Sequence, residues 1–410
     1  MRKPISQTSL AVMAVTMALV TAACGGSAAT NSSGGGESSA NEPIRVALVT
    51  PHSGPYAQYG EQQRAGVQFA AKQANAQGGI DGRKVEIYTA DSGGTPETAV
   101  VAVQRLVQQN KAKFVIGTIA TPETLAVMQR LQSLDALQFG TQSQGDALTG
   151  KSCVARFFRT NANDAMAGAG VAKWLEGRPE KSWDSIAADY AYGRDSTDTF
   201  KKTLLKHGGT LGKELYAPLG TTDFGSLISS LDGGDGLFVV ESGSDASNFY
   251  KQALQFGLFQ KYKTTVSNAG GINTSTLAAV GNGLAGQWGA TLWTSTVDTQ
   301  QTRDFVTAYK KDTGNLPADF AGNGYIGMQT LFAGVRKAGS VDTAKVGKAL
   351  EGLTFETLQG KVTMRAGDHQ LLVPIYVGQA DNAGGQPELK VTMALPASET
   401  TPQANTECHL

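Results

Sequence analysis

Short apolar runs alternate with helix-length patterns along most of this chain. RVALVT at 45–50 precedes a helical pattern over 61–76, and KVEIYTA at 84–90 precedes a helix that begins at Pro96. The alternation continues as far as ATLWT at 290–294. Strands that alternate with helices are typical of parallel sheets covered by helices. The pattern therefore predicts an α/β fold built from doubly wound parallel sheets.

The elements between these limits repeat the same order. Further strands are predicted at 113–117, 136–140, 184–189, 236–240 and 263–267, with helices that open at Pro122 and cover 165–175, 193–207 and 246–256. The pattern changes near the C-terminus, where two helices are predicted over 302–338, one over 343–350, and strands at 360–364, 371–378 and 389–395. We expect these last strands to be antiparallel and to close a sheet.

Residues 1–23 have the layout of a secretory signal. Two basic residues precede an apolar run over 10–20, and small residues lead to Cys24. The run is shorter than the roughly 18 residues of a membrane-spanning segment. The stretch TAACGG resembles the lipobox of bacterial lipoproteins, in which the cysteine is lipidated, although Thr21 stands where leucine is usual. We expect export with a lipid on Cys24; ordinary cleavage beside an incidental cysteine is the alternative.

A tether and a long folded body follow the signal. Residues 24–43 are rich in Gly, Ser and Asn and lack large apolar side chains, so they are predicted to form a flexible tether. The rest of the chain is longer than one hydrophobic core usually supports, so we expect two domains. Lys plus Arg and Asp plus Glu are equal at 35 each, and without a basic excess no nucleic acid is an expected partner.

Two cysteines remain beyond position 24, Cys153 and Cys408. An exported chain enters an oxidising compartment, in which two cysteines can pair. We predict a Cys153–Cys408 disulfide that joins the C-terminal tail, residues 396–410, to the first domain. Two free thiols are the alternative.

Motifs for enzymatic chemistry are absent or lie in the wrong context. The sequence has no GxSxG, no CxxC and no HExxH. GDALTGKS at 145–152 fits the phosphate-loop pattern by letter, but a strand-like run follows its lysine where a helix is required. GNGLAG at 281–286 is also followed by a strand-like run, which argues against a dinucleotide site. Nothing in the spacing of the four histidines suggests a metal site, and no cofactor is predicted.

The turn IGTIATPETL at 116–125 is the strongest candidate for ligand contact. A helix that opens after Thr121 leaves backbone N–H groups free to bind a carboxylate or a similar oxygen group. Open α/β sheets bind ligands at the carboxyl ends of their strands. This position favours ligand contact over the alternative, in which Thr121 is a plain helix cap.

Two more turns carry polar or aromatic side chains. The first strand leads to Tyr56 and Tyr59, whose rings offer a flat apolar face and a hydroxyl. His52 opens the same turn, where contact with a ligand and stabilisation of the loop are equal alternatives. The third turn contains donors and acceptors suited to an uncharged polar group: Gln142, Ser143 and Gln144.

A series of segments resembles the branched-chain amino-acid-binding family of type I solute-binding proteins. In chain order they are SGPYAQYG, QGGIDGRKVEI, VIGTIATPET, FFRTNANDAMAG and DYAYGRD, within a similarity that runs from about 44 to 395. The resemblance implies two lobes that are joined by three crossovers and close on a ligand about a hinge. The first lobe is then expected over 44–161 and 291–360, and the second over 162–290 and 361–395.

The resemblance also implies a ligand site in the cleft. By position, Tyr59 matches an aromatic residue that packs on the ligand, and Ala120 with Thr121 matches the turn that holds a carboxylate. The remaining implied contacts are Gln142, Ser143, Gln144, Asp164, Tyr190, Tyr192, Ser242 and Asn268.

One departure from the family concerns the ligand. Amino-acid-binding members place a carboxylate near the Asn268 position to neutralise the ligand's ammonium, whereas this chain has SNAGG there. A buried ammonium without a counter-charge is costly. Glu241 or Asp164 is one source of compensation; an amine-free acid, an amide or an aromatic compound is the alternative ligand.

Together these features predict a substrate-binding protein of an ABC importer. The expected partners are a small solute, the permease and ATPase subunits, and the membrane through the lipid anchor outside the cytoplasm, with the protein a monomer and not an enzyme. One alternative is a sensor that presents its closed form to a membrane receptor. The other is an exported hydrolase that uses Ser143 or Ser53 with His52, which lacks the orienting acid of a triad.

Overall fold

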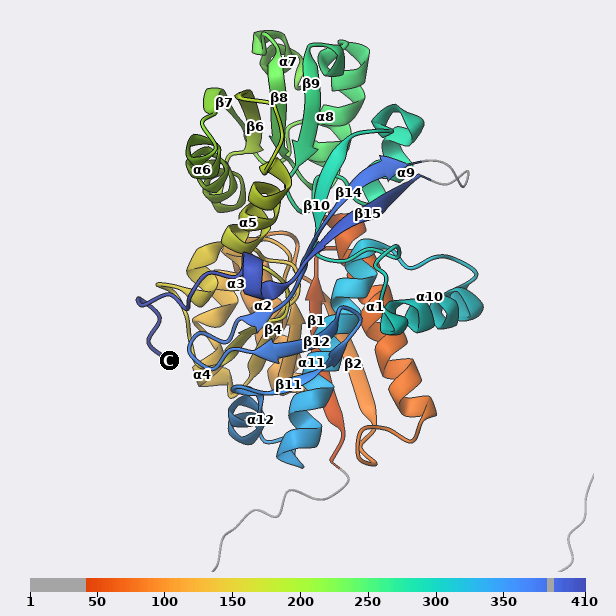
Figure 1. Ribbon diagram of the computed structural model, residues 1–410. Helices are drawn as coiled ribbons and strands as arrows, with labels where there is room; N and C mark the ends of the chain where they lie inside the picture. Colours follow the sequence, from red (N-terminus) through yellow and green to blue (C-terminus); the bar gives the residue numbers. More distant parts are fainter. Residues whose placement is uncertain (1–41, 382–386) are drawn as a thin grey trace, which may run out of the picture. The chain divides into compact units, whose positions relative to one another are not determined.

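The first sheet of the computed structural model is a five-stranded parallel sheet (Figure 1). The structure describes residues 42–381 and 387–410, so the predicted signal, Cys24 and nearly all of the tether lie outside it. The strand order is β2-β1-β3-β4-β5. The strands are β1 (Ile44–Thr50), β2 (Val85–Asp91), β3 (Phe114–Gly117), β4 (Leu137–Gly140) and β5 (Phe157–Arg159).

Alternate residues of β1 enter two different cores. Val46 and Leu48 pack in the core that contains α1 and α11, whereas Ala47 and Val49 pack with α2 and α3. Successive side chains of a strand point to opposite faces, so an apolar run such as IRVALVT requires helices on both sides. The helices of this lobe are α1 (Ala57–Ala76), α2 (Pro96–Asn110), α3 (Thr121–Met128), α4 (Leu131–Leu134), α10 (Gln300–Thr313), α11 (Asp319–Ala338) and α12 (Thr343–Leu350).

The second sheet has seven strands in the order β15-β14-β10-β9-β8-β6-β7. Its strands are β6 (Ser182–Ala188), β7 (Thr210–Ala217), β8 (Gly234–Val240), β9 (Tyr262–Ser267), β10 (Trp288–Thr291), β14 (Ile375–Asp381) and β15 (Glu388–Leu395). Only β14 and β15 are antiparallel to their neighbours, as predicted for the C-terminal strands. Its helices are α5 (Asp164–Leu175), α6 (Ala191–Lys206), α7 (Gly225–Ser230), α8 (Gly243–Gln255) and α9 (Thr274–Val280). We call each large sheet with its helices a lobe.

A small antiparallel sheet contains β11 (Thr354–Thr357), β12 (Gly360–Met364) and β13 (Leu371–Leu372). β12 pairs with β11 through a tight turn at Thr357–Gly360, and Gln370 forms a bridge with Arg159 at the edge of the first sheet. The prediction assigned residues 361–372 to the second lobe, but strand pairing joins them to β11. The last crossover therefore lies between β13 and β14.

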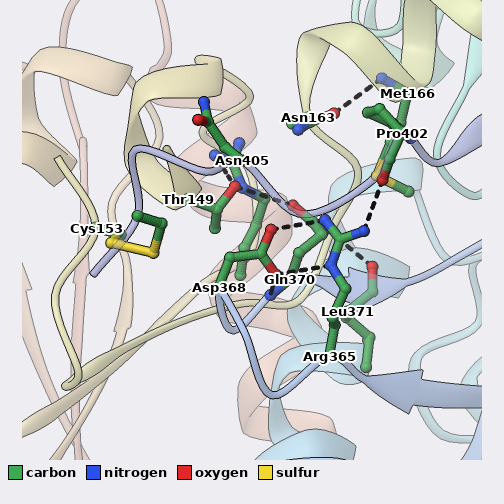
Figure 2. Close-up of polar contacts among 12 residues, drawn as sticks. Thr149, Cys153, Asn163, Met166, Arg365, Asp368, Gln370, Leu371, Pro402 and Asn405 are labelled. Carbon is green, nitrogen blue, oxygen red and sulfur yellow. Dashed lines mark hydrogen bonds and ion pairs between the residues drawn. A yellow bond between two sulfur atoms is a disulfide. The ribbon is translucent and has the colours of Figure 1, made fainter. Parts of the chain in front are cut away.

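The C-terminal tail forms a further connection beside the three crossovers. It leaves β15 at the edge of the second sheet, and α13 (Ala397–Thr400) then contacts α5. Figure 2 shows the carbonyl oxygen of Pro402 accepting a hydrogen bond from Arg365, at 2.6 Å. The structure then joins Cys408 to Cys153, the predicted partner, in a disulfide with Cα atoms 5.5 Å apart.

Candidate ligand-binding site

A cavity of 40 Å³ lies where the turns of the two lobes meet. Nearly all of its lining residues follow the carboxyl ends of parallel strands, where open α/β sheets bind ligands. The first lobe contributes Tyr56, Tyr59, Ile119, Thr121, Gln142, Gln144 and Phe320; the second contributes Tyr190, Tyr192, Ser242, Ala269 and Gly270. Seven of the eleven residues predicted to contact ligand are among them: Tyr59, Thr121, Gln142, Gln144, Tyr190, Tyr192 and Ser242.

Aromatic rings form much of the cavity wall. Tyr59 stacks on Phe320 with ring centroids 3.7 Å apart, and Tyr56 lies beside Tyr59 at 5.9 Å. All three side chains are buried. The rings provide a flat apolar surface for the body of a small solute.

Tyrosine hydroxyls connect the two lobes across the cavity. Tyr56 Oη hydrogen-bonds with Tyr190 Oη at 2.6 Å and with Ser242 Oγ at 3.1 Å. Tyr59 Oη accepts from the Gly243 amide at 2.7 Å and donates to the carbonyl oxygen of Gly270 at 3.0 Å. These bonds join the first turn of one lobe to three turns of the other, those after β6, β8 and β9.

Glycine at position 243 permits this close approach. The Gly243 backbone has φ +65°, and a Cβ there would lie 2.4 Å from the carbonyl oxygen of Pro55 and 2.9 Å from the Tyr56 ring. No L side chain fits that space. The turn after β8 therefore reaches the first lobe because it has no side chain at this point.

Thr121 does not have the capping role that was its alternative reading. It is the first residue of α3, and the N-cap is Ala120. Glu123 Oε2 accepts from the Ala120 amide at 3.0 Å, so a side chain of the helix itself already binds this amide. Thr121 Oγ1 instead accepts from the Gly145 amide at 3.2 Å, which ties the turn after β3 to the turn after β4.

The turn after β4 points two carboxamides at the cavity and its serine away. Gln142 Oε1 accepts from Asn323 Nδ2 at 3.2 Å, and Gln144 Nε2 donates to the carbonyl oxygen of Ala269, in the second lobe, at 3.1 Å. Ser143 Oγ hydrogen-bonds with the Ile119 carbonyl oxygen at 2.9 Å and with Thr124. The structure therefore holds Ser143 within the first lobe.

A buried arginine supports the same turn. Arg159 at the end of β5 is fully buried, and its guanidinium donates to the carbonyl oxygens of Ser143 at 3.0 Å and Gly145 at 2.8 Å. Gln144 lies between these two residues. Arg159 thus fixes the backbone that carries one of the cavity carboxamides.

Three further predicted residues lie beside the cavity without lining it. Ala120 caps α3, and Asp164 is buried at the start of α5, where burial raises the pKa of its carboxyl well above the ordinary value. Asn268 Nδ2 donates to Ser196 Oγ at 2.7 Å inside the second lobe. The residues that reach the cavity from this turn are the next two, Ala269 and Gly270.

Five lining residues were not among the predicted contacts: Tyr56, Ile119, Ala269, Gly270 and Phe320. Tyr56 lies in the predicted first turn, and Ile119 and Ala269 adjoin predicted contacts. Extending the prediction to the neighbouring residues of each turn would therefore have identified them. Phe320 lies in the first turn of α11, a helix that does not follow a strand end, so the position of strand ends gives no reason to expect it at the cavity.

The lining contains no charged side chain. Three carboxyls directly precede lining residues in sequence: Asp189, Glu241 and Asp319. Glu241, which precedes Ser242, is 1 % exposed. Burial, together with the charge of Asp245, raises the pKa of Glu241 to about 9. The carboxyl is therefore neutral at pH 7 and supplies no counter-charge for a cation.

The residues considered for a hydrolase do not come together in the described chain. His52 is exposed, and its backbone amide donates to Asp91 Oδ1 at 2.9 Å. Ser143 is instead bound to Ile119 and Thr124, as described above. The phosphate-loop pattern at 145–152 contains a 3₁₀ turn, Asp146–Thr149, and the pattern at 281–286 begins with another, Gly281–Leu284. The next element after each pattern is a strand, as their sequence contexts indicated.

No helix within residues 42–381 and 387–410 has the length and apolar character needed to cross a membrane. No group of three or more His, Cys, Asp and Glu side chains there is arranged to hold a metal ion.

A family model matches most of this chain, and the two relatives described here align with it over most of their own length. The model described as periplasmic binding protein matches residues 43–386. The leucine-, isoleucine-, valine-, threonine- and alanine-binding protein of Pseudomonas aeruginosa is 27% identical over 328 residues, which cover 79% of this chain and 86% of that protein. The Leu/Ile/Val-binding protein homolog 3 of Brucella melitensis is 29% identical over 335 residues, covering 80% and 88%.

Solved structures give the same fold. The amino acid ABC transporter substrate-binding protein of Pseudomonas fluorescens has a TM-score of 0.80 and 25% identity, with 90% of this chain and 99% of that chain covered. An ABC transporter solute-binding protein of Rhodopseudomonas palustris, in complex with 3,4-dihydroxybenzoic acid, has a TM-score of 0.81 and 22% identity, with 87% and 98% covered. The likeness confirms the predicted two-lobed fold.

Proposed function

Because the chain belongs to the periplasmic binding protein family, we propose that it is the extracytoplasmic substrate-binding component of an ABC importer. The cavity between the two lobes carries this proposal, since turns of both lobes line it and hydrogen-bond across it. A solute held there contacts two bodies whose covalent connections are the crossovers and the tail. Binding is thereby linked to the relative position of the lobes.

The mechanism is a shift between open and closed arrangements. A solute first docks on the first lobe at Tyr59 and Thr121; the second lobe then closes with Tyr190 and Ser242. The solute stabilises the closed form by its additional contacts there, and a permease distinguishes the closed form from the open one.

The site fits a small polar solute. The relatives named for leucine, isoleucine and valine have ligands that carry an ammonium group. In this chain the turn that carries a carboxylate in amino-acid-binding members of the family instead contributes Ala269 and Gly270 to the cavity. Burial keeps the Glu241 carboxyl neutral. An ammonium without a counter-charge is costly to bury, which favours an amine-free acid or an amide.

The remaining parts of the proposal concern how the protein is used. Cys24 carries the lipid that holds the protein at the outer side of the cell membrane, and the protein acts as a monomer. It binds its solute without changing it chemically. The permease and ATPase subunits are its partners.

Replacing Tyr59 by phenylalanine tests the closing mechanism. The change removes the hydroxyl that bonds Gly243 and Gly270 and leaves a buried amide unpaired, which costs the closed form about 1–3 kcal/mol. Solutes identified by a thermal-shift screen of amino acids, amides and small acids should bind at least about fivefold more weakly by calorimetry.

The control is Tyr88→Phe, which removes a hydroxyl on β2 that donates to Glu86, away from the cavity. Small-angle scattering should show compaction of the wild type on addition of the best solute. A solute that binds without compaction, or a full screen without any binder, would contradict the proposal.

A further inference from the structure

Two polar atoms in the cavity wall lack hydrogen-bond partners within the described part of the chain. They are Gln142 Nε2, a donor, and Gln144 Oε1, an acceptor. Gln142 is 5 % exposed and Gln144 is 9 % exposed. A buried polar atom without a partner costs about 1–3 kcal/mol, so two in one wall indicate a ligand that satisfies both.

The hydrogen bonds of the second lobe fix which atom of Gln144 is free. The backbone carbonyl oxygen of Ala269 can only accept, so Gln144 must present its NH₂ group there. Its oxygen then remains available to a donor. Gln142 uses its oxygen with Asn323 Nδ2, and its NH₂ group remains available to an acceptor.

Both glutamines also line an adjoining cavity of 30 Å³, which is bounded by Asn273, Asp319 and Asn323. The two glutamines thus lie between two spaces, of 40 and 30 Å³. One buried water occupies about 10–15 Å³, so the larger space holds only a few non-hydrogen atoms. A compact head group fits there and a long one does not.

The free donor, the free acceptor and the charge of the surroundings decide between a carboxylate, an ammonium and a carboxamide as the head group. A carboxylate has only acceptors and would place lone pairs against Gln144 Oε1. An ammonium has only donors and finds no carboxyl in the lining of the larger space. Asp319 bounds the adjoining space, but burial raises the pKa of its carboxyl, which disfavours the charged form that an ammonium would need. A carboxamide presents an N–H donor beside a C=O acceptor and carries no charge.

We propose that this site, in the function proposed above on which the inference rests, takes a small uncharged solute with a carboxamide head. Gln142 donates to the carbonyl oxygen of that head and Gln144 accepts from its N–H. The aromatic wall of Tyr59 and Phe320 contacts the apolar remainder of the solute. Amides and ureas are therefore the solute class.

Isothermal titration calorimetry with three matched probes tests this assignment. Propionamide, propionate and alanine have similar size and differ in their head groups. The full-length protein should bind propionamide at least tenfold more tightly than either of the other two. Equal or tighter binding of propionate or alanine overturns the assignment.

Substitution of the two glutamines is a second test of the carboxamide assignment. Gln142→Met removes the free donor and Gln144→Met removes the free acceptor, and each should weaken propionamide binding at least tenfold. Gln109→Met, on the exposed side of α2, is the matched control and should change nothing. Where a methionine variant fails to fold, Gln142→Glu replaces the donor by an acceptor in the same shape and should give the same loss.

The outcomes separate this inference from the proposed function. If leucine or propionate binds and compacts the protein while propionamide does not bind, the importer function stands and the carboxamide assignment is wrong. Propionamide binding that is unchanged in Gln142→Met and Gln144→Met also overturns the assignment. If no solute in a wide panel binds, both proposals fail.

Discussion

Burial changes the acid-base chemistry of Glu241. Glu241 directly follows β8, and neither of its carboxyl oxygens has a hydrogen-bond partner among the described residues. Burial first, and Asp245 second, raise the pKa of Glu241 to about 9 from an ordinary value of 4.5. The folded protein therefore holds a proton that the unfolded chain releases between these two pH values.

This proton makes stability depend on pH. The folded state binds more protons than the unfolded state between about pH 4.5 and 9, so the free energy of unfolding should fall as pH rises through that window. The slope for one fully titrating carboxyl is about 1.4 kcal/mol per pH unit. Urea unfolding of Glu241→Gln at pH 5, 6, 7 and 8 should give a visibly flatter profile than the wild type.

Glu61→Gln on the exposed face of α1 is the control for this pH series and should keep the wild-type slope. Parallel profiles for Glu241→Gln and the wild type would show that Glu241 is ionised in the folded protein.

Individual residues of the site can be predicted from the sequence mainly where they directly follow a predicted strand. Tyr59, Thr121 and Gln142 follow predicted strands, and topology alone brings such turns to one edge of a sheet. Asn268 follows a strand too, but its side chain turns toward Ser196 and the next two residues line the cavity. Phe320 lies outside this rule, because it reaches Tyr59 through the packing of α11 on α1.

At the scale of elements, Arg159 connects the end of β5 to the turn after β4. Its backbone amide donates to the carbonyl oxygen of His369 at 2.9 Å, beside the last crossover, and its side chain binds the carbonyl oxygens of Ser143 and Gly145. One residue thus joins a crossover to the turn that carries Gln144. This position gives it an effect on the site without contact with a solute.

Replacing Arg159 by lysine should loosen this turn. Lysine keeps the charge but lacks the planar fork that reaches two carbonyl oxygens at once, and a carbonyl left unpaired costs about 1–3 kcal/mol. Hydrogen exchange of the amides over residues 141–150 should accelerate at least tenfold, while amides of β8 stay protected. Arg105→Lys on the exposed face of α2 is the control; unchanged exchange over 141–150 would contradict the positioning role.

Buried elements were predicted more accurately than edge and short elements. β1, β3 and β8 are almost wholly buried, and continuous apolar runs mark them. β7 was missed because it is an edge strand whose residues are mostly half-exposed, so its sequence TLGKELYA lacks such a run. The strand at 360–364 was located correctly, but a strand pattern does not identify the partner, and β11 rather than the second sheet pairs with it.

For the whole molecule, the C-terminal disulfide adds stability to a two-lobed chain. Cys153 and Cys408 are separated by 255 positions, and a cross-link over so long a loop restricts the unfolded chain strongly. Cys408→Ser should lower the free energy of unfolding by about 2–5 kcal/mol. Urea unfolding followed by circular dichroism measures this difference.

A reducing agent should bring the wild type to the stability of Cys408→Ser and should leave the variant unchanged. Wild-type unfolding midpoints that are identical with and without reductant would mean that the bond contributes nothing to stability.

The same bond changes the connectivity of the molecule. Every strand of the second sheet, from β6 to β15, lies between Cys153 and Cys408, so the disulfide encloses that sheet in a covalent ring. A single peptide bond cut anywhere inside the ring leaves the two pieces attached to each other. A protease that nicks an exposed turn of the second lobe thus produces no free fragment until the sulfur–sulfur bond is reduced.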